Sequence, residues 1–152
     1  MWRSVIGIIA GFFAGAFVVF LIELPGMIAY PPPPGVDMKD QEAMRAHLAK
    51  LPFAAIAGVG LAWTVGPFVG AWLAALTARR AFLAHALVIG VVFLAMDVWM
   101  LLIIPHPLWL TIVGVVGPLV SSCLGGLLAA RMVRPPAGGP RPYDMRDKNM
   151  AC

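Results

Sequence analysis

The chain has 152 residues, of which 61% are hydrophobic and only 12% charged, and its mean hydropathy is +0.90. Soluble domains average about 25% charged residues, so a water-soluble fold of this length could not hide so much apolar surface, and lipid must be the main solvent. The net charge of +4 does not indicate nucleic-acid binding, because the basic residues cluster at the ends of apolar segments, as membrane orientation requires.

The first apolar segment, residues 5–28, is predicted to be a retained membrane helix. Its apolar run is longer than the 7–15 residues of a signal-peptide core, and no A-x-A cleavage site follows it. Gly7, Gly11 and Gly15 recur every four residues, a spacing that lets another helix backbone approach closely. Glu23 lies near the far end of this segment.

The loop over residues 31–51 is predicted to contain a short surface helix. Four prolines at residues 31–34 must be extended, since proline fixes φ and lacks an N–H. Asp37 or Asp40 can then cap a helix that lies against the membrane or over the bundle. The apolar face of that helix would hold Met44, Leu48 and Leu51.

The second span, residues 52–76, carries the longest stripe of small residues in the chain. Seven small residues recur at four-residue intervals, which is a packing pattern, and Pro67 is expected to kink the helix. The stripe consists of Ala54, Gly58, Ala62, Gly66, Gly70, Ala74 and Ala78.

The third span, residues 82–104, places a carboxylate inside a hydrophobic helix. Asp97 lies within about 20° of Ala86 and Gly90 on a helical wheel, so it is expected to face the bundle interior. An acid at mid-helix costs about 2.5–3.5 kcal/mol on insertion scales, and it therefore predicts a functional position. The span ends in a Pro-His-Pro turn that contains His106.

The fourth span, residues 108–132, again has small residues at four-residue spacing, including Gly117, Ser121 and Gly125. Residues 135–152 are rich in proline, glycine and charge, and are expected to be a flexible cytoplasmic tail. Residues 1–134 are thus predicted to be one all-α transmembrane domain, a four-helix bundle.

The distribution of basic residues predicts the orientation of this bundle. Four spans place both termini on one side of the membrane, and that side holds eight of the eleven basic residues. The positive-inside rule then predicts that both termini are cytoplasmic. The eight residues are Arg3, Arg79, Arg80, Arg131, Arg134, Arg141, Arg146 and Lys148.

The two helical hairpins resemble tandem copies. Residues 65–69 (VGPFV) match residues 116–120 (VGPLV), and each acid, Glu23 or Asp97, stands eight residues before a proline. Both copies run in the same direction, so a pseudo-two-fold axis along the membrane normal is predicted.

Few residue patterns in the chain suggest chemistry. There is no nucleophile elbow or phosphate loop, no Cys/His spacing for a metal and no lysine within a span, so no catalytic residue, metal or cofactor is expected. The polar candidates are Glu23, Asp97 and His106, which could form a cation or proton site. Alternatively, each acid hydrogen-bonds a neighbouring helix or reaches the interface.

Four features occur together in this chain. They are an acid late in the first span (Glu23), a proline-rich loop (residues 31–40), an I-P-H-P-L-W turn (residues 104–109) and spans rich in small residues. This combination resembles small uncharacterised four-span proteins of the bacterial inner membrane, over residues 1–134. The resemblance implies a location in that membrane and implies no activity.

Two functions are compatible with these patterns. The first is a non-enzymatic accessory or scaffolding subunit that packs against other membrane chains or its own copies, because small-residue faces occur on at least three helices. The alternative is a small ion- or proton-coupled transporter that uses the intramembrane carboxylates.

Overall fold

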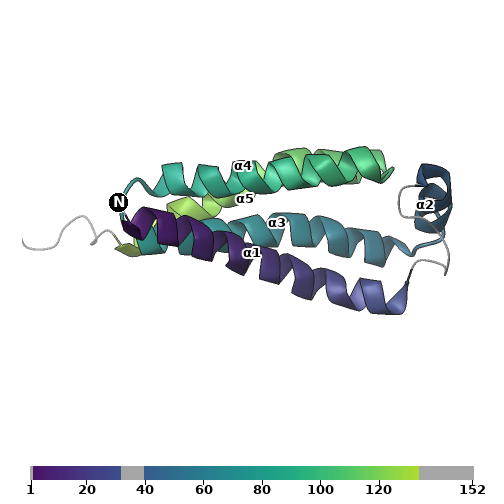
Figure 1. The fold of residues 1–152 in the computed structure, drawn as a ribbon, viewed down its shortest axis with the longest axis horizontal. Helices are drawn as coiled ribbons and strands as arrows, with labels where there is room; N and C mark the ends of the chain where they lie inside the picture. The colour runs from purple at the N-terminus through teal and green to yellow at the C-terminus, as the bar shows by residue number, and fades with distance from the viewer. Residues whose placement is uncertain (1, 32–39, 134–152) are drawn as a thin grey trace, which may run out of the picture.

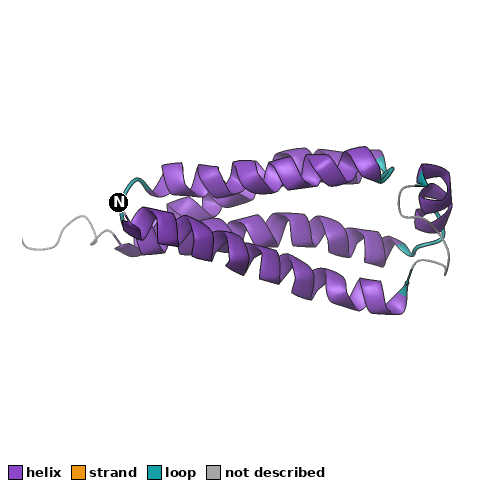
Figure 2. Ribbon diagram, in the orientation of Figure 1, coloured by secondary structure: helices purple, strands orange, loops and turns teal. Residues whose placement is uncertain are grey.

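The computed structural model describes residues 2–31 and 40–133, and in this part of the chain helices are joined by short loops, with no strand (Figure 2). The helices are α1 (Trp2–Ala29), α2 (Gln41–Leu48), α3 (Phe53–Ala78), α4 (Phe82–Ile103) and α5 (Leu108–Val133). All but α2 are long and apolar enough to cross a membrane. The all-α membrane bundle predicted from the sequence is confirmed. The predicted tail and most of the proline run lie outside the described residues.

The four long helices run alternately up and down along one common direction (Figure 1). The start of α1 and the end of α5 lie at one end of the bundle, and the short helix α2 lies across the other. We refer to these as the terminal end and the α2 end. Arg80 closes the terminal end, where its Nη2 donates a hydrogen bond to Ser4 Oγ at 3.2 Å.

Glycine lets the backbones of α1 and α3 touch. An added Cβ would lie 2.9 Å from the Ala74 carbonyl oxygen if built on Gly7, and 2.7 Å from the Gly66 carbonyl oxygen if built on Gly15. Gly11 and Gly70 face each other in the same way between these contacts. Contacts this short leave no room for any side chain, which is the packing that four-residue spacing favours.

The second hairpin and its contact with the first are equally close. Gly90 of α4 lies against the hydroxyl of Ser122, which is fully buried. On α5, a Cβ added to Gly117 would lie 2.8 Å from Thr64 Cγ2, and one added to Gly125 would lie 2.5 Å from the Phe68 carbonyl oxygen. The small residues thus hold α4 to α5 and α5 to α3.

Gly58 does not pack against another helix of the bundle, and the packing role predicted for Ser121 stays a prediction. A Cβ added to Gly58 would meet nothing within 4 Å. A four-residue spacing gains about 40° per step on a 3.6-residue helix, so Gly58 is rotated by about 120° from Gly70, the middle of the α1 contact, and lies outside that contact. Ser121 donates its hydroxyl to the Pro118 carbonyl oxygen of its own helix at 3.4 Å.

The structure leaves the tandem duplication a prediction. Pro67 and Pro118 are both fully buried, as equivalent positions should be. The neighbouring glycines differ, because Gly66 contacts α1 within its own hairpin whereas Gly117 contacts α3 of the other hairpin. Helix α3 packs against all three other long helices and occupies the centre of the bundle.

Candidate functional site

The bundle contains a cavity of about 840 Å³ at its α2 end. Its walls come from α1, α3 and α4, and α2 and the turn between α4 and α5 complete them. Most of the lining is apolar. Glu23, Asp97 and His106 all line this cavity, so the structure brings together the three polar residues singled out in the sequence.

Glu23 lies on α1 and is bound to a tryptophan of α3. Its carboxyl group accepts a hydrogen bond from the Trp63 side chain, whose indole N–H is the donor. Trp63 is buried, and its ring stands 5.5 Å from the His106 ring between centroids, at 57°. Gly114 of α5 makes room for this indole, since a Cβ there would lie 2.7 Å from Trp63 Cζ3.

Asp97 projects from α4 and is almost completely buried, with 5% of its surface exposed. Its Oδ2 atom is buried and has no hydrogen-bond partner. Asp97 also lies within electrostatic range of Glu23. A buried polar atom without a partner is rare in a folded protein, and it makes Asp97 a candidate binding group.

Within residues 2–31 and 40–133, no positive side chain balances these acids in the cavity. No lysine or arginine of the described residues lines it. Arg3, Arg79, Arg80 and Arg131 belong to the terminal end of the bundle, at the start of α1 and near the ends of α3 and α5. Arg45 and Lys50 lie on α2 or just after it, but neither lines the cavity. Neither acid therefore has a described basic partner among the lining residues.

His106 adds a neutral imidazole to the site. Its Nδ1 lies 2.7 Å from the Ile104 carbonyl oxygen, and since a carbonyl only accepts, Nδ1 carries the proton. Burial lowers the pKa of His106 from its ordinary value, and the bond to Ile104 offsets part of that shift. The ring is consequently uncharged at neutral pH and does not repel a bound cation.

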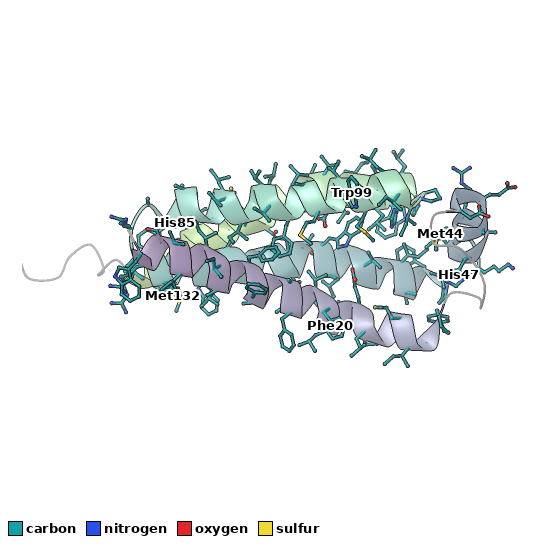
Figure 3. All side chains as sticks on the ribbon, in the orientation of Figure 1. Phe20, Met44, His47, His85, Trp99 and Met132 are labelled. Atoms are coloured by element: carbon teal, nitrogen blue, oxygen red, sulfur yellow. The ribbon has the colours of Figure 1, made fainter. Side chains whose placement is uncertain are left out.

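Helix α2 covers the end of the cavity. Asp40 caps it by accepting hydrogen bonds from the backbone N–H of Glu42 at 3.0 Å and of Ala43 at 3.2 Å, as predicted. Met44 points from α2 toward the bundle and is 4% exposed (Figure 3). With Leu48 and Leu51 it lines the cavity, so the predicted apolar face lies over the bundle.

The other two histidines take no part in the site. His85 lies at the terminal end, far from α2 (Figure 3), where its Nδ1 is 3.0 Å from the Ala81 carbonyl oxygen. His47 lies on α2 and does not line the cavity. Within residues 2–31 and 40–133, no three His, Cys, Asp or Glu side chains are grouped to hold a metal ion.

Sequence reasoning missed Trp63. A tryptophan deep in an apolar span buries an indole N–H that must find an acceptor. That requirement was the sequence feature that could have identified Trp63 as a partner of an intramembrane acid. Its acceptor, Glu23, lies on a different helix, so the pairing depends on how α1 and α3 are rotated against each other.

Comparison with models of protein families, with curated proteins and with solved structures finds no match to this chain.

Proposed function

We propose that the chain is a small ion- or proton-coupled transporter in which Glu23 and Asp97 together bind the transported or coupling cation. The observation that supports this most is the cavity itself, into which α1 and α4 each bring one carboxyl group. Asp97 Oδ2 has no partner there, and no described basic side chain neutralises either acid.

The energetics of burial favour this proposal over a purely structural role. An ionised carboxylate removed from water costs several kcal/mol unless an opposite charge or a set of hydrogen bonds compensates it. Trp63 supplies one hydrogen bond to Glu23, and Asp97 has no equivalent donor at Oδ2. We infer that a proton or a bound cation supplies the missing compensation, because exchange between the two is the chemistry of a coupled transporter.

We propose that the protein lies in the inner membrane of a bacterium, with both termini in the cytoplasm. The basic residues at the terminal end support this orientation through the positive-inside rule. The cavity and α2 then face the extracytoplasmic side. Cysteines introduced at Gln41 and Gly138 should react with an impermeant thiol reagent on intact cells only at Gln41, and labelling at Gly138 alone would reverse the orientation.

An accessory or scaffolding subunit that packs against other membrane chains is the second candidate function. Gly26 and Gly58 favour it, because a Cβ added to either would meet nothing. Both glycines line the cavity, however, so their open space is part of the proposed binding site and does not by itself indicate a partner helix. On the side toward the terminal end, the space between α1 and α4 is filled by the rings of Phe12 and Phe93, which are 5.7 Å apart, and by Gly15 beside Phe93.

The deciding experiment measures ion movement into proteoliposomes. Purified chain is reconstituted with a pH-sensitive dye inside, and proton entry is driven by an imposed membrane potential or by an outward Na⁺ or K⁺ gradient. Wild-type protein should carry protons, whereas Glu23→Gln and Asp97→Asn should not. Glu42→Gln, an exposed acid of α2, is the matched control and should retain the flux.

A wild-type chain that moves no protons under any of these gradients would contradict the transporter proposal, as would undiminished flux in both carboxyl variants. If, in addition, the chain is recovered from membranes in a stoichiometric complex with other membrane proteins, the accessory-subunit proposal replaces it.

A further inference from the structure

The size and lining of the cavity indicate more than a site for a proton or a metal ion. A bare proton needs no space, and an inorganic cation that sheds its water requires a close shell of oxygen ligands. This cavity has a volume of about 840 Å³, within the range of small-molecule sites, and two acids stand among mostly apolar walls. Such a site suits an organic ligand with one positive charge and an apolar body.

The walls match the body of such a ligand. Phe93 and Tyr30 contribute aromatic rings, and four methionines contribute thioethers: Met27, Met44, Met96 and Met100. Aromatic faces attract organic cations, and unbranched methionine side chains adapt to ligands of different shape. The carboxyl groups then select for positive charge. The walls select for a large apolar ligand without requiring one particular shape.

The cavity opens sideways toward lipid. Phe20 and Met27 of α1, and Met96 and Met100 of α4, line the cavity and are also at least 40% exposed on the bundle surface. The helices α1 and α4 approach each other toward the terminal end and diverge toward α2 (Figure 1). Since α2 covers the end of the cavity, the mouth between α1 and α4 faces the hydrocarbon of one leaflet.

We propose that the ligand is a lipophilic organic cation, such as a quaternary ammonium or phosphonium compound, that reaches Glu23 and Asp97 from the membrane between α1 and α4. This rests on the proposed function, because it names the class of cation that the carboxylate site binds. The ligand first partitions into the leaflet, and its charged group then moves between the two carboxyl groups while its apolar part fills the cavity.

Tetraphenylphosphonium tests the ligand class. Equilibrium binding of the radiolabelled cation to the detergent-purified full chain should be saturable. Tetraphenylborate has nearly the same shape and the opposite charge, and should not compete. Glu23→Gln and Asp97→Asn should each weaken binding by about tenfold or more, as expected for the loss of a charged contact, and Glu42→Gln should not change it.

Dodecyltriphenylphosphonium tests the route. A mouth open to lipid lets the alkyl chain remain in the membrane, so this compound should compete at least as well as tetraphenylphosphonium. Failure to compete would overturn lateral access, and equal competition by tetraphenylborate would overturn the ligand class. The comparison of ligands on wild-type protein does not depend on any variant folding.

The two proposals fail in different ways. If the protein carries protons but binds no lipophilic cation, the transporter proposal is supported and the proposed ligand class is wrong. Saturable, carboxyl-dependent binding of tetraphenylphosphonium, with no proton movement even when the compound is added on one side of the proteoliposomes, would support the site and overturn coupled transport.

Discussion

The two tryptophans of α3 provide a matched test of how Glu23 is held. The Trp63 indole N–H donates to Glu23, whereas Trp72 Nε1 is buried and has no hydrogen-bond partner. Trp63→Phe should lose a bond worth about 1.7 kcal/mol, the upper end for membrane proteins. Trp72→Phe should instead remove an unsatisfied donor and recover about 1 kcal/mol. The two variants should then differ by about 2.7 kcal/mol in unfolding free energy, roughly a hundredfold in the unfolding equilibrium.

The measurement is reversible unfolding of the purified chain in mixed micelles. Helix content is monitored by far-UV circular dichroism, because tryptophan fluorescence would itself change in these variants. Trp63 is also the more buried ring, so lost packing acts in the same direction. A Glu23→Leu background separates the two effects, because there Trp63→Phe should cost only the packing term, less about 1 kcal/mol recovered by removing an indole N–H that has lost its acceptor. The reasoning is refuted if Trp63→Phe costs the same in both backgrounds, or if Trp72→Phe is the more destabilising change.

Three further predictions concern the rest of the bundle. Burial lowers the pKa of His106, so the unfolded chain takes up a proton more readily; the contribution of His106 to stability is full above its ordinary pKa of 6.5 and is lost as the pH falls below it. His106→Gln should therefore flatten the acid side of the stability profile measured between about pH 8 and pH 5. Gly15→Leu should prevent α1 from docking, because a Cβ there already meets the Gly66 carbonyl oxygen at 2.7 Å, whereas Gly58→Leu should leave size-exclusion behaviour and helicity unchanged. Ala81 has a left-handed backbone with φ of 45°, so Ala81→Gly should raise the unfolding free energy by about 1 kcal/mol in the same micelle assay.

Each of these has a contrary result. An unchanged acid limb in His106→Gln would mean that the imidazole is already accessible to protons. Equal loss of folded protein in Gly15→Leu and Gly58→Leu would mean that the α1 contact with α3 is not close. A destabilised Ala81→Gly would show that the turn between α3 and α4 has a different backbone in the membrane.

The spans could be predicted from the sequence because hydropathy, length and terminal arginines act locally along the chain. The same is true of α2, whose cap at Asp40 and apolar position Met44 follow from spacing within a single short helix. Even the meeting of Glu23 and Asp97 could be anticipated in part. Both lie late in helices that run in the same direction, so they reach a similar depth toward the α2 end.

The small-residue stripes predict a packing face for each helix, but which helix each face meets could not be predicted in this way. Every span is apolar on all sides, so hydrophobicity does not identify which face turns inward. The close contacts at Gly15 and Gly66 set the rotation of α1 against α3, and they thereby bring Glu23 to Trp63 and leave Gly58 at the cavity. The cavity itself is a product of that rotation and of the divergence of α1 from α4, neither of which is a local property.

The most direct test of whether Glu23 and Asp97 form one site is a comparison of proton flux. The wild type, Glu23→Gln, Asp97→Asn and the double variant are each reconstituted separately at the same protein density. Residues that act as a unit are strongly non-additive. We expect each single variant to lose the flux as completely as the double variant does. If one single variant keeps wild-type flux, or if the two partial losses multiply in the double variant, the carboxyl groups act separately and the shared site is wrong.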